Sequence, residues 1–225
     1  MSGRVARSHT GRRAGTHRLG TRGRPEESRA AILNAAVAEF AEHGIAGART
    51  DAIAREAHVN KALLYYYFKD KDALYEAVLD HVFSGLRARV MPVLECDLPP
   101  RQKMLEYLGA YFDYIAANPR FPRVVQSEWM RSGEGTSRMQ RVAQEYFRPI
   151  FEKVAEVLRE GIRTGEFRAL NPLDFLPSVA AMIVFYFSAA PLMKTLMKLD
   201  PLSEERIRER RAFVLDFVST ALFKS

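Results

Sequence analysis

The apolar residues of this chain recur every three or four positions from Pro25 to the C-terminus, which is the spacing of one face of an α-helix. In the first such stretch Ile32, Ala36 and Phe40 fall on one face, and Gly44 follows as a helix end. No segment shows the sustained alternation of apolar and polar residues that is typical of a half-buried strand. The pattern therefore predicts an all-α fold.

Three helix starts in the next segment are marked by residues that favour the N-cap position. Thr50 is expected to cap a short second helix, Asn60 a short third helix, and Asp70 a longer fourth helix. The fourth helix should run towards Val90, with Pro92 disturbing its far end. Two short helices followed by a long one are the predicted order up to that point.

Longer and more apolar helices are predicted beyond Pro100, separated by segments rich in glycine and proline. Their expected ranges are 101–117, 120–131, 137–164, 173–197 and 203–223. Pro149 should kink the third helix of this set, because proline cannot donate the helical hydrogen bond. The predicted architecture is a three-helix domain over residues 25–70 joined to a larger helical domain over residues 71–225.

The uncharged run of residues 175–193 approaches the roughly 20 apolar residues that a helix needs to cross a bilayer. Pro177, Pro191 and two serines within the run weaken that interpretation. A helix that is apolar on all sides can equally be buried between subunits. We therefore expect the helices over 173–197 and 203–223 to pair with their symmetry mates in a homodimer, without a membrane.

The basic charge of the chain is concentrated in one segment. Residues 1–24 contain seven arginines and no lysine or acidic residue, so they account for the whole net charge of +7. Such a segment, with almost no large apolar side chain, is expected to be disordered. It either follows DNA phosphates as an electrostatic arm or serves only as a solubilising tail, and both alternatives stay open at this point.

The segment of residues 50–75 has the pattern of a helix-turn-helix, in which two short helices are locked by inward residues across a tight turn. Ile53, Leu64 and Phe68 are expected to face inward. The second helix then presents an outward face to the major groove of DNA, with its N-terminal end at the base edges. On that face Lys61 can donate to guanine, and tyrosine hydroxyls can donate to phosphate oxygens.

Residues 30–78 resemble the DNA-binding domain of the TetR family of regulators. The matching positions are Ile32, Ala35, Ala36, Phe40, Gly44, Thr50, Ile53, Ala54, Ala57, Val59, Leu64, Tyr65, Tyr67, Phe68, Lys71, Leu74 and Val78. The resemblance implies contacts with DNA at Thr50, Lys61, Ala62, Leu63, Tyr65, Tyr66, Tyr67 and Lys71. Lys61, Ala62 and Leu63 are the expected base readers. His58 departs from the family pattern, because glycine usually fills this turn, and it is expected to take a positive φ.

The resemblance also implies an effector pocket in the C-terminal domain. The candidate lining residues are Tyr107, Tyr111, Trp129, Phe147, Phe151, Met182 and Phe185. So many aromatic side chains favour an apolar or aromatic small molecule as the effector. Glu128 is expected either as a carboxylate on the helix surface or as the partner of a cationic ligand.

Residues that would support catalysis or metal binding do not form a recognisable pattern. The five histidines do not combine with Cys96 or the acids at metal-ligand spacing, and no phosphate loop or nucleophile motif occurs. Asp80 and His81 are interpreted as a solvated pair rather than a catalytic dyad. We expect no enzymatic activity, no metal and no cofactor. A single cysteine indicates a reducing compartment. The family resemblance implies the bacterial cytoplasm, at the nucleoid.

Together these features predict a homodimeric repressor that binds double-stranded DNA at a palindromic operator and releases it when a small molecule enters the C-terminal domain. Release is expected because the fourth helix, which both domains share, tilts when the effector is bound. The alternative is the same fold acting as an activator, or as a regulator that a partner controls without a small-molecule ligand.

Overall fold

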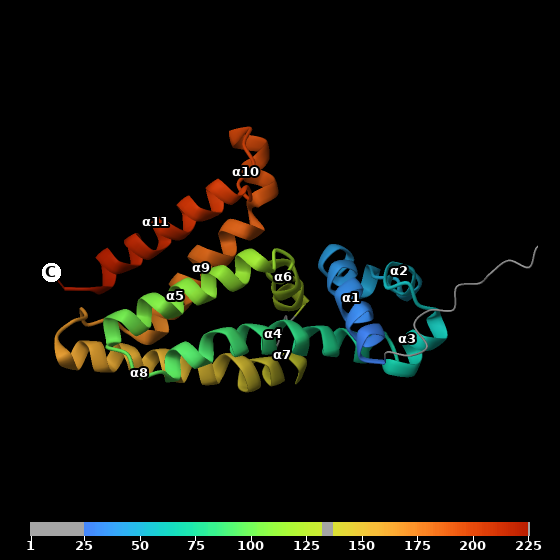
Figure 1. The fold of residues 1–225 in the computed structure, drawn as a ribbon, viewed down its shortest axis with the longest axis horizontal. Coiled ribbons are helices and arrows are strands. Elements are labelled where there is room, and N and C mark those ends of the chain that lie inside the picture. The colour runs from blue at the N-terminus through green and yellow to red at the C-terminus, as the bar shows by residue number, and fades with distance from the viewer. Residues whose placement is uncertain (1–24, 132–136, 225) are drawn as a thin grey trace, which may run out of the picture.

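The computed structural model describes residues 25–131 and 137–224, so the arginine-rich segment 1–24 lies outside the described residues. The described chain is helical almost throughout (Figure 1). Its only β-type pairing is an isolated antiparallel bridge between Phe167 and Phe223. The predicted all-α fold is confirmed.

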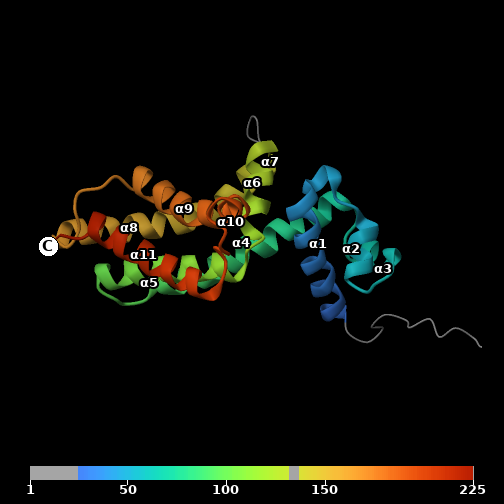
Figure 2. The same ribbon diagram turned by 90° about the horizontal axis from the view of Figure 1, so that it is seen from above.

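The first three helices form a small unit at one end of the molecule (Figures 1 and 2). They are α1 (Pro25–Gly47), α2 (Thr50–Glu56) and α3 (Lys61–Tyr67). Gly44, at φ 61°, breaks the regular helix of α1, so only a short turn follows it. His58 takes φ 54° in the turn between α2 and α3, as predicted for this unusual turn residue.

Two of the three predicted N-caps are present. The side chain of Asn60 accepts a hydrogen bond from the Leu63 N–H at 2.7 Å, and Asp70 accepts one from the Ala73 N–H at 2.8 Å. The prediction for Thr50 is wrong, because Arg49 is the N-cap of α2 and Thr50 is the first helical residue. The backbone N–H of Arg49 is instead fixed by the Glu39 carboxylate at 2.9 Å.

Helix α4 (Lys71–Glu95) runs from the small unit into the larger one and packs against both. Figure 1 shows it running from the small unit along the larger one. Tyr75, near its start, is fully buried, and its ring meets the Phe40 ring of α1 edge-on at 4.9 Å. Pro92 lies inside α4, three residues before its end. Because α4 packs on both sides, the division at residue 70 stays a prediction.

The central helices are α5 (Pro100–Ala117), α6 (Phe121–Arg131), α7 (Ser137–Val142) and α8 (Arg148–Thr164). A π-helical turn, η1 (Ala143–Phe147), joins α7 to α8 where a kink at Pro149 was predicted. The N–H of Arg148 donates to the Ala143 carbonyl, five residues earlier. An inserted residue of this kind lets the helix continue past a proline that cannot donate its own hydrogen bond.

The C-terminal helices are α9 (Pro172–Ser188), α10 (Ala190–Met197) and α11 (Glu204–Leu222). The single helix predicted over 173–197 is therefore wrong, since the chain bends by 60° between α9 and α10. Pro191, in the first turn of α10, explains the break because it cannot continue the hydrogen bonding of α9. None of the described helices is by itself long and apolar enough to cross a membrane, and α9 with α10 meets that length only as this bent pair.

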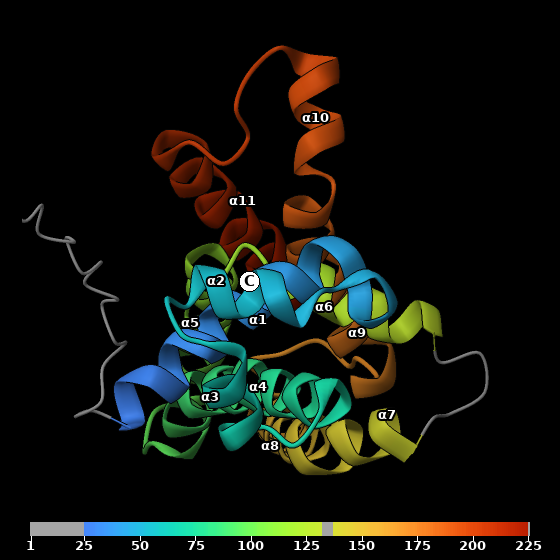
Figure 3. The same cartoon turned by 90° about the vertical axis from the view of Figure 1, so that its right-hand side faces the viewer.

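The apolar stripe of α11 divides into two faces. Val214, Val218 and Leu222 are buried against the rest of the chain. Phe213 and Phe217 stack on each other at 5.9 Å and remain half exposed. Figure 3, which looks onto the end formed by the first three helices, shows α10 and α11 standing out on one side of the molecule.

Candidate nucleic-acid interface and internal cavity

Helix α3 is held by a few buried anchors and turns its other side outward. Leu64 is fully buried and Phe68 nearly so, and they pack with Ile53 of α2 in the core of the small unit. On the outer side, Tyr66 is the most exposed aromatic residue of the helix, with 80% of its surface accessible, and Tyr65 is 39% accessible. The predicted DNA-facing residues Lys61 and Ala62 are also exposed, whereas Leu63 and Tyr67 are half-buried.

Polar contacts join the start of α2 to the start of α3. The Thr50 hydroxyl and the Tyr65 hydroxyl lie 3.2 Å apart, within hydrogen-bond distance. The Lys61 ammonium lies 2.8 Å from the Asp51 carboxylate and 6.0 Å from the centre of the Tyr65 ring. The hydrogen bond and charge of Lys61 lower the pKa of Asp51, and Asp51 in turn raises the pKa of Lys61. Sequence reasoning missed Asp51, although its place beside Thr50 could have indicated it.

Lys71 has partners within the protein. Its ammonium donates to the carbonyls of Ala46 and Ala48, at 3.3 and 3.2 Å, and so ties the start of α4 to the end of α1. A lysine ammonium has three donors, so one remains for a phosphate oxygen. Its contact with DNA stays a prediction, as do those of the other seven residues.

A cavity of about 520 Å³ lies in the larger unit, lined by residues of α4, α5, α6, η1, α8 and α9 and open to solvent on the side of the exposed Phe185. Such a volume is within the range of small-molecule sites. Five of the seven predicted residues line it, namely Tyr107, Tyr111, Phe147, Phe151 and Phe185. The side chain of Trp129 lies outside the described residues.

Met182 does not line the cavity, contrary to its prediction. Its helix turns this position towards α11, where the Met182 carbonyl accepts a hydrogen bond from Arg210 at 2.9 Å. Sequence reasoning also missed several lining residues, including Leu86 and Val90 of α4 and Gln126 of α6. Their apolar spacing looks the same as ordinary core packing, so only the fold could assign them to the cavity.

The cavity wall carries few polar groups. The rings of Tyr107 and Tyr111 lie parallel, 6.2 Å apart, on α5. Neither hydroxyl has a protein partner among the described residues, and burial raises the pKa of each phenol well above its usual value. These two neutral phenols can donate or accept single hydrogen bonds within an otherwise apolar space.

Comparison with known families agrees with both parts of this geometry. Residues 32–78 match the model of the bacterial regulatory proteins of the tetR family, and residues 100–218 match that of the tetracyclin repressor-like C-terminal domain. The chain belongs to the TetR family. It is therefore a DNA-binding transcriptional regulator of the helix-turn-helix class.

Individual relatives in the TetR family are similar over most of their length. The transcriptional repressor SCO4008 of Streptomyces coelicolor is 34% identical over 77% of this chain and 84% of its own. The transcriptional repressor NicS of Pseudomonas putida is 25% identical over 92% of this chain and 98% of its own. The crystal structure of the putative transcriptional regulator SCO4942 from Streptomyces coelicolor matches with a TM-score of 0.62 at 28% identity, covering 87% of this chain and 98% of that one.

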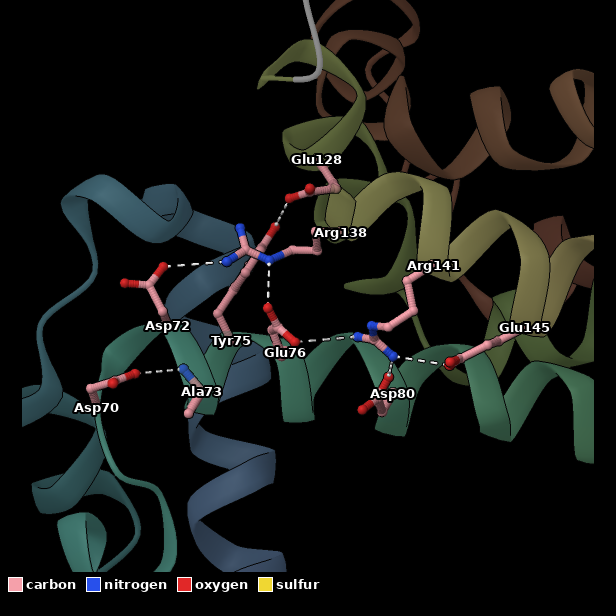
Figure 4. A network of polar contacts seen from close by, with 10 residues as sticks. All are labelled: Asp70, Asp72, Ala73, Tyr75, Glu76, Asp80, Glu128, Arg138, Arg141 and Glu145. Carbon is pink, nitrogen blue, oxygen red and sulfur yellow. Dashed lines mark hydrogen bonds and ion pairs between the residues drawn. The ribbon is translucent and has the colours of Figure 1, made fainter. Parts of the chain in front are cut away.

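In this TetR-family chain, an arginine clasp holds α4 against α7 just beyond the helix-turn-helix (Figure 4). Arg138 donates to Asp72 at 3.3 Å and to Glu76 at 3.4 Å. Arg141 donates to Asp80 at 2.6 Å and to Glu145 at 3.0 Å. The three acidic residues of α4 are spaced one helical turn apart, so they form a single row that faces α7.

The sequence interpretation of two acidic residues needs correction. Glu128 is only 1% exposed, so it is not a surface carboxylate, and it does not line the cavity. It accepts a hydrogen bond from the Tyr75 hydroxyl at 3.0 Å, because α6 turns this side towards α4. Asp80 is bound by Arg141 and by the Tyr146 hydroxyl at 3.1 Å, while His81 points to solvent, so the predicted pair of Asp80 with His81 is not formed.

Proposed function

We propose that this protein is a homodimeric repressor that binds a palindromic operator and is released by an apolar or aromatic small molecule. Two recognition helices related by a two-fold axis would enter successive major grooves roughly 34–36 Å apart. Lys61, Ala62 and Leu63 would contact bases, while Thr50, Tyr65, Tyr66, Tyr67 and Lys71 would contact phosphates. A protein that acts on the chromosome in this way would work in the cytoplasm, at the nucleoid.

The dimer proposal is supported by where large apolar side chains are exposed. In the described chain they occur in two regions, the tyrosines of α3 and the three helices α9 to α11. The second group comprises Leu173, Phe185, Leu192, Leu196, Met197, Phe213 and Phe217. An exposed apolar face of this extent is typical of a surface that another subunit covers. Phe217→Glu should therefore give monomers in sedimentation experiments and weaken operator binding.

One observation carries the proposal of ligand control, namely that α4 serves both sites. Its first turns pack on α1 and lie directly after α3, and its residues Leu86 and Val90 form part of the cavity wall. A molecule that fits the cavity better in one tilt of α4 than in another would shift the population of the DNA-binding state. The clasp at Arg138 and Arg141 would limit the available positions of α4 to a few discrete ones.

The first test is binding to DNA upstream of the protein's own gene, over a series of salt concentrations and with excess competitor DNA. Specific binding by the full chain and by residues 25–225 would support the repressor proposal. A shallower salt dependence for the shorter chain would mean that the arginine-rich segment contacts phosphates, and equal slopes would make it a solubilising tail. No specific binding there, or in a genome-wide selection of bound sequences, would refute the operator proposal.

The second test separates ligand control from the alternative of an activator or a partner-controlled regulator. A thermal-shift screen of apolar and aromatic compounds should find at least one that stabilises the protein and releases operator DNA. Cross-linking the two units of each subunit should abolish release, and full release from the cross-linked dimer would contradict the proposed tilt. Transcription that falls when the gene is deleted would favour an activator.

A further inference from the structure

The reading end of α3 carries an acid as well as a base. Lys61 is the first residue of α3, and its ammonium lies 2.8 Å from the carboxylate of Asp51 in α2. The side chains are 52% and 58% accessible, so the pair faces solvent rather than the core. An acidic residue at a surface that approaches DNA is unfavourable for binding phosphates. Asp51 therefore does not increase the general affinity for DNA, and another function has to explain its position.

Neighbouring contacts keep the pair in place. The hydrogen bond between the Thr50 and Tyr65 hydroxyls joins the same two helix ends, and the Tyr65 ring lies beside the Lys61 ammonium. Tyr65 is itself one helical turn after Lys61 on α3. The donor and the acceptor are thus presented side by side from two helices in a fixed relative position.

The spacing of this pair matches the edge of a base pair. In the major groove a G·C pair presents the guanine O6 and N7 acceptors and, next to O6, the cytosine N4 donor. The O6 and N4 atoms are joined by a hydrogen bond, so they are about 2.9 Å apart. An ammonium with three donors can contact O6 and N7 together, while a carboxylate accepts from N4. A T·A pair offers the same order of acceptor and donor but places a methyl group next to the ammonium.

We propose that Asp51 is a specificity-determining residue, which acts with Lys61 to read one G·C base pair in each half of the operator. The proposal rests on the DNA-binding role proposed above for α3. Asp51 also offsets the charge of Lys61 on DNA that lacks this base pair, where its carboxylate meets no donor. Binding to other sequences is therefore weakened while binding to the operator is kept.

The competing explanation is an ordinary surface ion pair that joins α2 to α3 and contributes about 0–1 kcal/mol to stability. The two explanations differ for a variant in which the residues are exchanged, Asp51→Lys with Lys61→Asp. The exchange keeps the net charge and can keep the ion pair, but it reverses the positions of donor and acceptor. A purely structural pair would leave the preferred DNA sequence unchanged.

The experiment is a selection of bound sequences from a random DNA pool with the full-length protein. The wild type should enrich a palindrome with a G·C pair at the position nearest the start of α3. Asp51→Ala, which removes the acceptor, should lower the preference for that pair by about tenfold or more, and the exchanged variant should lose or reverse it, with other positions unchanged. The matched control is Glu56→Gln, which removes an equal charge from an exposed position at the other end of α2 and should leave every position unchanged.

A second readout is the affinity for competitor DNA across salt concentrations. Asp51→Asn should bind competitor DNA more tightly. Its plot of log binding constant against log salt concentration should also be steeper, by roughly 0.9 for each additional phosphate contact. A wild-type palindrome whose base preferences are the same in Asp51→Ala and in the exchanged variant would overturn this inference alone. Failure of the wild type to enrich any sequence would instead overturn the proposed function, and the inference with it. Thermal unfolding of each variant verifies that it is folded.

Discussion

The recognition surface and the cavity of the larger unit differ in how their residues are held. On the surface of α2 and α3, four polar side chains are held in pairs, Asp51 with Lys61 and Thr50 with Tyr65. In the cavity the wall is mainly apolar, and the hydroxyls of Tyr107 and Tyr111 have no protein partner among the described residues. The recognition surface holds hydrogen-bonding groups in defined directions, whereas the cavity provides mainly a space of defined size and shape.

This difference indicates how selective each site can be. A site with directional donors and acceptors rejects a partner that lacks the matching group, because its polar atoms are then left unpaired. An apolar cavity distinguishes molecules mainly by size and shape, at about 1–3 kcal/mol for each methylene. We therefore expect narrow selectivity for DNA sequence and broader selectivity among effectors of similar volume.

The largest expected effect breaks the recognition surface and leaves the cavity intact. Leu64→Ala removes a fully buried anchor of α3 and should lower the free energy of unfolding by about 2–5 kcal/mol. Urea unfolding measures this loss, and operator binding should fall with it. Leu63→Ala, at the half-buried neighbouring position, is the control and should cost less. Equal losses for the two variants would contradict the assignment of Leu64 as the anchor.

A second substitution should partly fill the cavity and leave the recognition surface unchanged. Ala180→Phe places a ring in the cavity, so binding of the apolar dye anilinonaphthalene sulfonate should weaken by about tenfold or more. Fluorescence titration measures the dye, and operator affinity should stay within twofold of the wild type. Ala88→Phe, at an exposed position of α4 outside the cavity, is the matched control. Unchanged dye binding in Ala180→Phe would place the dye elsewhere.

Alkaline pH should affect the cavity region through its phenols. Burial raises the pKa of Tyr111 above its ordinary value of 10.0, so this phenol keeps its proton in the folded state at pH values where the unfolded chain releases it. Stability is thus complete below pH 10 and falls above it, by about 1.4 kcal/mol per pH unit for each such phenol. Urea unfolding at several alkaline pH values should show a smaller fall for Tyr111→Phe. The same slope in both proteins would argue against this cause.

The smallest expected effect concerns a single hydroxyl on the recognition surface. Tyr66 is 80% accessible, so Tyr66→Phe should leave thermal stability unchanged. Its proposed hydrogen bond to a phosphate is worth about 0.5–1.5 kcal/mol, which predicts weaker binding to every DNA sequence by up to about tenfold. Titration of operator and competitor DNA in parallel distinguishes this from a loss of sequence preference. A change confined to the operator would make Tyr66 a base reader instead.

The sequence predicted features that depend on local residues and missed those that depend on distant ones. The caps at Asn60 and Asp70 each involve a backbone N–H three residues away, so a short segment contains both partners. The N-cap of α2 is Arg49 rather than Thr50, and the Arg49 N–H donates to the carboxylate of Glu39, ten residues earlier, a contact that the local sequence does not show.

The same rule applies to the cavity and its surroundings. Five of the candidate lining residues do line the cavity, but Met182 does not, because the side of α9 that faces the cavity depends on how the helices pack together. The burial of Glu128 likewise depends on Tyr75, which lies 53 residues earlier in the chain. The orientations of Met182 and Glu128 cannot be predicted from the spacing of residues along a single helix.

The π-helical turn at Ala143–Phe147 joins α7 to α8. It therefore fixes the directions in which the side chains of α8 point relative to those of α7. Before the turn, Arg138 and Arg141 face the acidic row of α4, and after it, Ile150 and Phe151 face the cavity. Each residue of an α-helix advances the face by about 100°, so deleting one residue here would turn one set of side chains away from its partner. In an insertion–deletion scan of this helix, these five residues should therefore be the least tolerant of a change in length, although only one of them, Phe147, lines the cavity.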